Sequence, residues 1–145
     1  MKKIIVAVDG SEHAMRALEK AKEIGKAFNS NIVIVYVMNN DQIHLSDSVT
    51  QTMVMESVNA LESEKKEGEA LLARAKSVAE EFGSKVETVL LAGDASLVLL
   101  HFIKSSDADL VILGSHGVKG LRQFMLGSVV SKIIHHIEKT IMIVR

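Results

Sequence analysis

The sequence predicts an α/β fold built around a parallel β-sheet, and two observations lead to this prediction. Short, continuous apolar runs rich in β-branched residues recur along the chain, as expected for strands buried on both faces. Segments with apolar residues at helical spacing separate these runs, and such alternation is typical of a parallel sheet flanked by helices. Because 145 residues suffice for one substantial core, we expect a single domain over residues 1–145.

The first strand and helix are expected on either side of a short polar turn. Residues 4–8 read Ile-Ile-Val-Ala-Val, and this strand is expected to end at Asp9. Asp9-Gly10-Ser11 then supplies the turn and a helix cap. The next segment is an amphipathic helix, whose inward apolar residues are Ala14, Ala17, Leu18, Ala21, Ile24 and Phe28.

The second strand is expected at residues 32–38, followed by a polar, irregular connection over 39–52. A helix is expected from about Met53 to Phe82, and the charge run at 62–69 is interpreted as its solvated face. The helical period is clearest in the second half of this segment, where the apolar positions are Leu71, Leu72, Ala75, Val78, Ala79 and Phe82.

The last third of the chain predicts two more helices and three more strands. Strands are expected at 86–91, 107–113 and 140–144. A turn at 93–96 opens a helix through about Ser105, whose apolar residues 97–103 we expect to be deeply buried rather than to form an exposed partner surface. A final helix is expected at 128–137, with inward residues Val129, Ile133, Ile134 and Ile137.

Composition excludes several classes of function. The chain is 48% hydrophobic and 24% charged with a net charge of −1, so it offers no global attraction for nucleic acid or anionic lipid. It has no cysteine, which excludes disulfides, a thiolate nucleophile and Cys-type zinc sites. No signal-peptide core or membrane-length apolar run is present, and we therefore expect a cytoplasmic protein without membrane or nucleic-acid partners.

The most informative motif is the glycine-rich stretch GSHGVKGLRQFMLGS over residues 114–128. It leads from a predicted strand to a predicted helix, where free backbone N–H groups and the helix dipole favour a phosphate. Gly114 and Gly117 stand at the strand exit and Gly127-Ser128 at the helix start, so both ends can converge on one phosphate chain. Ser128 can cap the helix, donate to a phosphate or help to hold a divalent cation through the nucleotide. Lys119 and Arg122 add positive charge within the loop.

Taken alone, each glycine favours interpretation as an ordinary turn residue, and Ser128 as an ordinary helix cap. The combination matches a known pattern, because G-x2-G-x9-G-[S/T] is met in full at Gly114, Gly117, Gly127 and Ser128. VAVDGSEHAMRAL at 6–18, the Gly93-Asp94 turn and IMIVR at 141–145 extend the similarity. The chain resembles the universal stress protein family, in its nucleotide-binding branch, over nearly its whole length. The phosphate loop GxxxxGK[ST] and a GxGxxG loop after the first strand are both missing.

The resemblance implies a Rossmann-like, open five-stranded parallel sheet with helices on both faces and strand order 3-2-1-4-5. It implies a homodimer in which the last strands of two subunits pair. The implied cofactor is ATP or another adenine nucleotide, accompanied by Mg²⁺ or Mn²⁺ held through its phosphates, near Ser128, rather than directly by the protein.

The resemblance also assigns roles to residues. Asp9 is placed at the adenine or its immediate surroundings and Val37 against the adenine. Without the resemblance, Asp9 is equally consistent with an Asx-type cap over Ser11 and Glu12, and Val37 is interpreted as a core residue. Ribose and phosphates are assigned to Gly114, Gly117, Gly127, Ser128 and the Val129 backbone, and the candidate set is completed by Gly10, Ser11, Gly93 and His116.

The sequence departs from the family pattern in two respects. Val130 stands where a small or hydroxyl-bearing residue is frequent, and it cannot donate to phosphate. The turns at 93–95 and 137–140 lack the usual proline. These changes bear on affinity and loop rigidity rather than on the fold.

No residue of the sequence is an evident catalyst, since ATP hydrolysis needs a group that positions or activates water. Asp41 and Asp94 are interpreted as turn residues, and His116 is expected to face solvent rather than act as a general base. His135 and His136 are adjacent on a helix and cannot form an i, i+4 metal pair.

Three hypotheses remain. The leading one is a nucleotide-dependent regulator or sensor with an unidentified protein partner. The second is a slow ATPase or phosphotransfer protein with at most weak hydrolysis. The third is a nucleotide-free dimeric interaction module, in which the apolar helix at 97–103 contributes to assembly.

Overall fold

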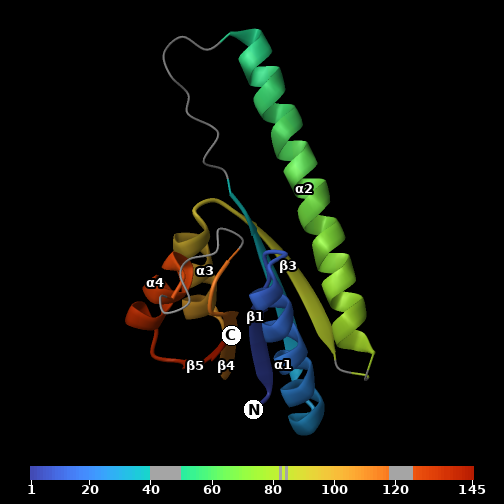
Figure 1. Cartoon of the computed structure of the whole chain (residues 1–145), viewed down its shortest axis with the longest axis vertical. Helices are drawn as coiled ribbons and strands as arrows, with labels where there is room; N and C mark the ends of the chain where they lie inside the picture. The colour runs from blue at the N-terminus through green and yellow to red at the C-terminus, as the bar shows by residue number, and fades with distance from the viewer. Residues whose placement is uncertain (40–49, 82, 84, 118–125) are drawn as a thin grey trace.

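The structure is a computed structural model that describes residues 1–39, 50–81, 83, 85–117 and 126–145. Its strands form one parallel sheet in the order β3-β2-β1-β4-β5, so the expected fold and strand order are confirmed (Figure 1). The elements alternate along the chain as predicted: β1 (Lys3–Ala7), α1 (Glu12–Phe28), β2 (Asn31–Met38), α2 (Gln51–Glu80), β3 (Val86–Ala92), α3 (Ala95–Ser105), β4 (Leu110–Gly114), α4 (Ser128–His136) and β5 (Thr140–Val144).

Two hydrophobic cores lie on the two faces of this sheet. Successive side chains of a strand point to opposite faces, and in β1 the side chains of Ile4 and Val6 join one core while Ile5 joins the other. The first core is closed by α1 and α2, and the second by α3 and α4. Figure 1 shows the same division, with α3 and α4 on one side of the strands and α1 and α2 on the other.

The strand order reverses at β1, and this reversal positions the candidate site. From β1 the chain moves outward through β2 to β3, then returns to β4 on the other side of β1. In the resulting register Ile5 lies between Val33 of β2 and Val111 of β4. Ligands of open α/β sheets bind beyond the carboxyl ends of the strands at such a reversal.

Helix α2 is much longer than the sheet it covers. Its 30 residues span about 45 Å at the usual helical rise, and its N-terminal half extends beyond the strands (Figure 1). The buried residues of α2 all lie in the second half: Gly68, Leu72, Ala75 and Ala79. Of the predicted connection over 39–52, residues 40–49 lie outside the described part of the chain, whereas Gln51 and Thr52 are helical and Thr50 caps the helix. Phe82 also lies outside it.

Three apolar side chains that were expected to face inward are exposed. Phe28 is 59% exposed at the last position of α1, Leu97 is 55% exposed in the first turn of α3, and Ile134 is 36% exposed on α4. The expectation of deep burial for α3 therefore holds only for its inner face, where Leu99 and Ile103 are buried. One helix face can pack on a sheet, and these three residues lie off that face.

Strand β4 begins at Leu110, three residues later than predicted. The preceding aspartates instead contact the start of β1. The Asp109 carboxylate accepts hydrogen bonds from the backbone N–H groups of Lys2 and Lys3, and Asp107 forms an ion pair with Lys3. Residues 107–109, which were expected to begin the strand, thus make polar contacts with the N-terminal residues instead.

Among the helices that the structure describes, none combines the length and apolar character required to cross a membrane.

Candidate functional site

The carboxyl ends of β1, β2 and β4 border a cavity of about 130 Å³. The first turns of the helices α1, α3 and α4 also contribute to its wall. Its strand-end walls are largely apolar, while Asp9 and His116 bring polar side chains. The lining residues are Ala7, Val8, Asp9, Ala14, Val35, Val37, Ala95, Leu99, Leu113, Gly114, His116, Gly117, Val129 and Val130.

Six of the predicted site residues line this cavity and five do not. The six are Asp9, Val37, Gly114, His116, Gly117 and Val129. The other five, Gly10, Ser11, Gly93, Gly127 and Ser128, belong to the turns and helix ends that hold the lining segments. Lys119 and Arg122 lie outside the described residues.

The turn after β1 fixes the carboxylate of Asp9 at the cavity. Asp9 Oδ1 accepts a hydrogen bond from the backbone N–H of Ser11 at 2.9 Å, and Ser11 Oγ accepts one from Ala14 at 3.2 Å. Gly10 has φ +83°, a backbone conformation that favours glycine. Asp9 therefore forms an Asx turn with Ser11, which is the N-cap residue of α1, and it also lines the cavity.

The two glycines after β4 differ in what surrounds them. A Cβ on Gly114 would lie 2.7 Å from the carbonyl carbon of His13 and 2.8 Å from the nitrogen of Ala14. Gly114 therefore lets α1 pack directly against the end of β4. Among the described residues, a Cβ on Gly117 would meet the side chain of Asp9 alone, at 2.8 Å from Oδ2. Gly117 thus brings the exposed backbone of the loop to the cavity carboxylate.

The N-terminus of α4 closes the site from the other side. Gly127 is the N-cap residue, and Ser128 is the first helical residue with an exposed side chain, so Ser128 does not cap the helix as we considered. The Gly127 N–H donates to the carbonyl of Ser115 at 2.9 Å, which ties α4 to the exit of β4. The first N–H groups of a helix have no acceptor within that helix. Within the described part of the chain no side chain caps this helix start, so these N–H groups can donate to an anion beside Val129.

The turn after β3 supports the site without lining it. Gly93 has φ +132° and donates its N–H to the carbonyl of Met38 at 2.9 Å. Asp94 then caps α3, accepting from Ser96 Oγ at 2.7 Å and from the Leu97 N–H at 2.9 Å. The Ser96 hydroxyl, and after it the Leu97 N–H, lowers the pKa of the Asp94 carboxyl. This cap places the next residue, Ala95, at the cavity wall.

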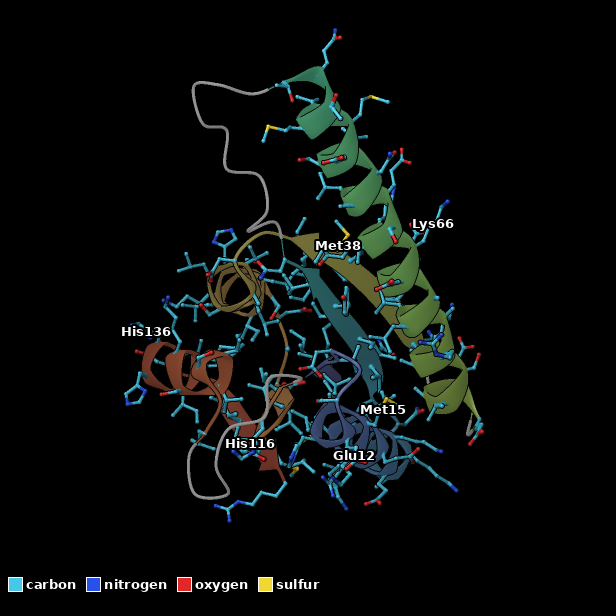
Figure 2. The ribbon with its side chains drawn as sticks, turned by 45° about the horizontal axis from the view of Figure 1, so that its top comes forward. Glu12, Met15, Met38, Lys66, His116 and His136 are labelled. Atoms are coloured by element: carbon cyan, nitrogen blue, oxygen red, sulfur yellow. The ribbon has the colours of Figure 1, made fainter. Side chains whose placement is uncertain are left out.

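His116 is buried, contrary to the expectation that it faces solvent. Its side chain is 8% exposed, and its ring lies against that of His13, with centroids 5.0 Å apart. Ser115, fully buried, lies between the two: its Oγ is 2.9 Å from His116 Nδ1 and 3.2 Å from His13 Nδ1. Figure 2 shows His116 beside the start of α1, where Glu12 is labelled. Within the described part of the chain, nothing pairs with the buried His116 Nε2.

Two other histidines contact their own helix. His135 Nδ1 lies 2.6 Å from the carbonyl of Ser131, and His136 Nδ1 lies 2.7 Å from that of Lys132. Figure 2 shows His136 on the outer side of α4. Over the ranges that the structure describes, no three His, Asp or Glu side chains are grouped so as to hold a metal ion.

Sequence reasoning missed part of the apolar wall and the Ser115–His13 contact. Ala7, Val35 and Leu113 line the cavity because they point to the same face of the sheet near its carboxyl edge. The alternation of side chains along each strand could have identified them once the strand ends were known. Ser115 and His13 carry no comparable signal, because they stand 102 positions apart.

The family and fold of the chain are established by comparison with known proteins. The family model described as "Universal stress protein family" matches residues 1–145. The chain belongs to the universal stress protein family. A curated member, the universal stress protein YxiE of Bacillus subtilis, is 32% identical over 145 residues, covering 99% of this chain and 98% of YxiE.

Solved structures of the family share the fold. The protein MJ0577 superimposes with a TM-score of 0.86 at 23% identity, over 99% of this chain and 94% of that one. A universal stress protein family member from Arabidopsis thaliana, solved with AMP bound, gives a TM-score of 0.70 at 20% identity, over 99% and 91% of the two chains. At these identities the similarity supports the fold alone.

Proposed function

We propose that the chain is a nucleotide-dependent regulator that binds ATP, acting as one domain over residues 1–145. The observation that carries the proposal is the cavity itself. It combines apolar strand-end walls with a carboxylate and with a helix N-terminus approached by two glycine-bearing turns. A family member with AMP bound supports an adenine nucleotide as the ligand class.

In this proposal the base occupies the apolar part of the cavity against Val37 of β2, with Asp9 at the adenine or its immediate surroundings. The ribose and phosphates extend past Gly114 and Gly117 to Gly127, Ser128 and the backbone of Val129. Phosphate oxygens accept from the backbone N–H groups at the start of α4, and the Ser128 hydroxyl donates beside them. Gly10, Ser11 and Gly93 hold the surrounding turns. Mg²⁺ or Mn²⁺ accompanies the phosphates, near Ser128.

The proposed partner of the chain, besides the nucleotide, is a second copy. Strand β5 lies at one end of the sheet order and is paired with β4 on one side, so its other edge offers backbone groups to a matching strand. Light scattering should then give twice the chain mass of 15.8 kDa. A monomeric mass at micromolar concentration would contradict the dimer without affecting the nucleotide site. The cytoplasm is the proposed compartment, and the chain is proposed to regulate an unidentified protein partner.

The function is tested by denaturing the purified protein, identifying any nucleotide released, and titrating nucleotide-free protein with ATP by calorimetry. We expect bound adenine nucleotide or saturable ATP binding. If no nucleotide is released and no ATP binding is measured, the dimeric interaction module is the surviving hypothesis. Incubation with ATP and Mg²⁺ then separates the regulator from a slow ATPase or phosphotransfer protein, because the regulator leaves stoichiometric ATP uncleaved.

A single substitution tests whether the loop after β4 belongs to the site. Gly117→Val places a branched side chain against Asp9 and in the proposed path of the phosphates, so we expect ATP affinity to fall at least tenfold, or about 1.4 kcal/mol. Gly117 does not have a positive φ, so the backbone itself accepts the change. Unchanged affinity in a folded Gly117→Val protein would remove this loop from the site.

A further inference from the structure

The contacts among His13, Ser115 and His116 restrict where hydrogens can lie. Ser115 Oγ is within hydrogen-bond distance of one nitrogen of each ring, and a serine hydroxyl has one hydrogen to donate and two lone pairs to accept with. It can therefore donate to only one of the two histidines. Toward the other it must act as the acceptor of a ring N–H.

Which ring accepts from Ser115 determines what His116 offers at its far nitrogen. If Ser115 donates to His116 Nδ1, a neutral His116 carries its hydrogen on Nε2 and is a donor there. If His116 Nδ1 instead donates to Ser115, a neutral ring leaves Nε2 as a bare acceptor. The tautomer of His116 is thus set by a hydrogen bond on the opposite side of the ring.

The far nitrogen is the one that has no partner. His116 Nε2 is buried, and none of the residues that the structure describes forms a hydrogen bond with it. An unsatisfied buried polar atom is costly, so it indicates a group that the described residues do not supply. His116 also lines the cavity, next to Gly117.

We propose that His116 Nε2 donates a hydrogen bond to a phosphate oxygen of the bound nucleotide, and that Ser115 is the positioning residue that keeps the hydrogen on Nε2. In this arrangement His13 Nδ1 donates to Ser115 Oγ and Ser115 donates to His116 Nδ1. A donor is required because phosphate oxygens only accept. The inference rests on the proposed function and adds to it a phosphate contact with a defined tautomer.

Two substitutions at His116 distinguish the roles of its two ring nitrogens. An asparagine amide reaches about as far as Nδ1, whereas a glutamine amide reaches about as far as Nε2. We expect His116→Asn to weaken ATP binding about tenfold or more, the range of a hydrogen bond to a charged group, and His116→Gln to recover part of the loss. Adenosine, which has no phosphate, should bind His116→Asn and the wild type equally. An equal loss for adenosine, or no loss for ATP, would overturn the proposal.

The tautomer is first measured on the wild-type protein, and this first measurement does not depend on a variant that folds. ¹⁵N chemical shifts of the His116 ring in the ATP complex should show the hydrogen on Nε2, and Ser115→Ala should shift the ring toward a mixture of tautomers. An acceptor Nε2 in the wild-type complex, or an unchanged tautomer in a folded Ser115→Ala protein, would contradict the proposal. If the wild type binds no ATP, the proposed function fails with it. If ATP binds but His116→Asn binds as tightly as the wild type, only the present inference fails.

Discussion

Gly114 shows how one residue of a binding motif can serve the fold. Backbone atoms of His13 and Ala14 lie within 2.9 Å of the position a Cβ would take, closer than packed atoms approach. Gly114 also lines the cavity. Its absence of a side chain is therefore required by the packing of α1 on β4, whatever binds beside it.

Gly114→Ala should destabilise the protein. The added methyl group overlaps backbone atoms, which cannot rotate away as a flexible side chain can, so we expect a loss of about 1–3 kcal/mol, as for other overpacked sites. Urea unfolding measures this loss. Gly127→Ser is a matched control for overpacking, because its Cβ would meet Ser115 and His116 at ordinary distances of 3.5 Å and more, and serine is at least as good as glycine at an N-cap. Equal unfolding midpoints for Gly114→Ala and the wild type would contradict the packing argument.

Gly127 differs from Gly114, because neither its backbone conformation nor its packing requires a glycine. Its φ of −60° suits any residue, and as the N-cap of α4 it makes no side-chain hydrogen bond. Serine is a slightly better cap than glycine. A glycine at this position is therefore better explained by what must approach the helix end than by the helix.

Gly127→Ser should accordingly change stability and ATP affinity in opposite directions. The cap hydroxyl should raise the free energy of unfolding by a few tenths of a kcal/mol, while its side chain obstructs the phosphates and lowers ATP affinity. Denaturant unfolding and calorimetry on the same preparation measure both. A more stable variant with unchanged ATP affinity would show that no phosphate passes Gly127.

At the scale of elements, the sequence predicted which segments are helices and strands because periods of two and 3.6 residues depend on neighbouring positions. It did not predict side-chain contacts made between distant segments. The ring of His116 packs against that of His13 of α1. The carboxylate of Asp109 accepts from the backbone N–H groups of Lys2 and Lys3, just before the point where β4 begins. The carboxyl-edge position of Asp9, Val37 and Gly114 was predictable because the strand ends were, whereas the Ser115 contacts were not.

The cap of α3 is an element whose strength should depend on pH. Hydrogen bonds from Ser96 and Leu97 lower the pKa of Asp94, so the folded state favours the ionised carboxyl. Its contribution to stability is present above the usual pKa of an aspartate. It is lost as pH falls through the lowered value in the folded protein.

Two substitutions of Asp94 separate the cap from its charge. Asp94→Ala should cost about 0.5–2 kcal/mol at pH 7, the range for a lost N-cap. Asp94→Asn keeps a capping oxygen that does not titrate, so it should lose less stability at pH 7 than Asp94→Ala does. The stability difference between Asp94→Asn and the wild type should be smaller at pH 3 than at pH 7. Urea midpoints at the two pH values measure this. If the stability difference between the wild type and Asp94→Asn increased from pH 7 to pH 3, the proposed role of the Asp94 charge would be contradicted.

At the scale of the whole molecule, the site joins parts of the chain that are far apart in sequence. The cavity wall takes residues from β1, β2, β4 and the starts of three helices. A ligand bound there contacts segments from Ala7 to Val130 at once. Binding should therefore stabilise the entire sheet arrangement rather than one loop.

ATP should raise the unfolding temperature by an amount that grows with the logarithm of its concentration above the dissociation constant. A ligand at 100 times its dissociation constant adds about 2.7 kcal/mol when it binds the folded state alone. The thermal midpoint of the wild type should rise with ATP concentration, and the midpoint of Gly117→Val should rise less at the same concentration. Equal shifts for both proteins would mean that ATP stabilises the chain from a different surface.

The length of α2 has a consequence for how the molecule opens. Its buried residues begin at Gly68, so the turns before that point are held mainly by their own backbone hydrogen bonds, and such turns open without unfolding the core. Amide hydrogens before Gly68 should exchange with solvent deuterium sooner than those at Leu72 to Ala79, and a protease should cut the projecting half first. The helix is continuous in shape, but we expect its projecting half to open more often than the half that packs on the sheet.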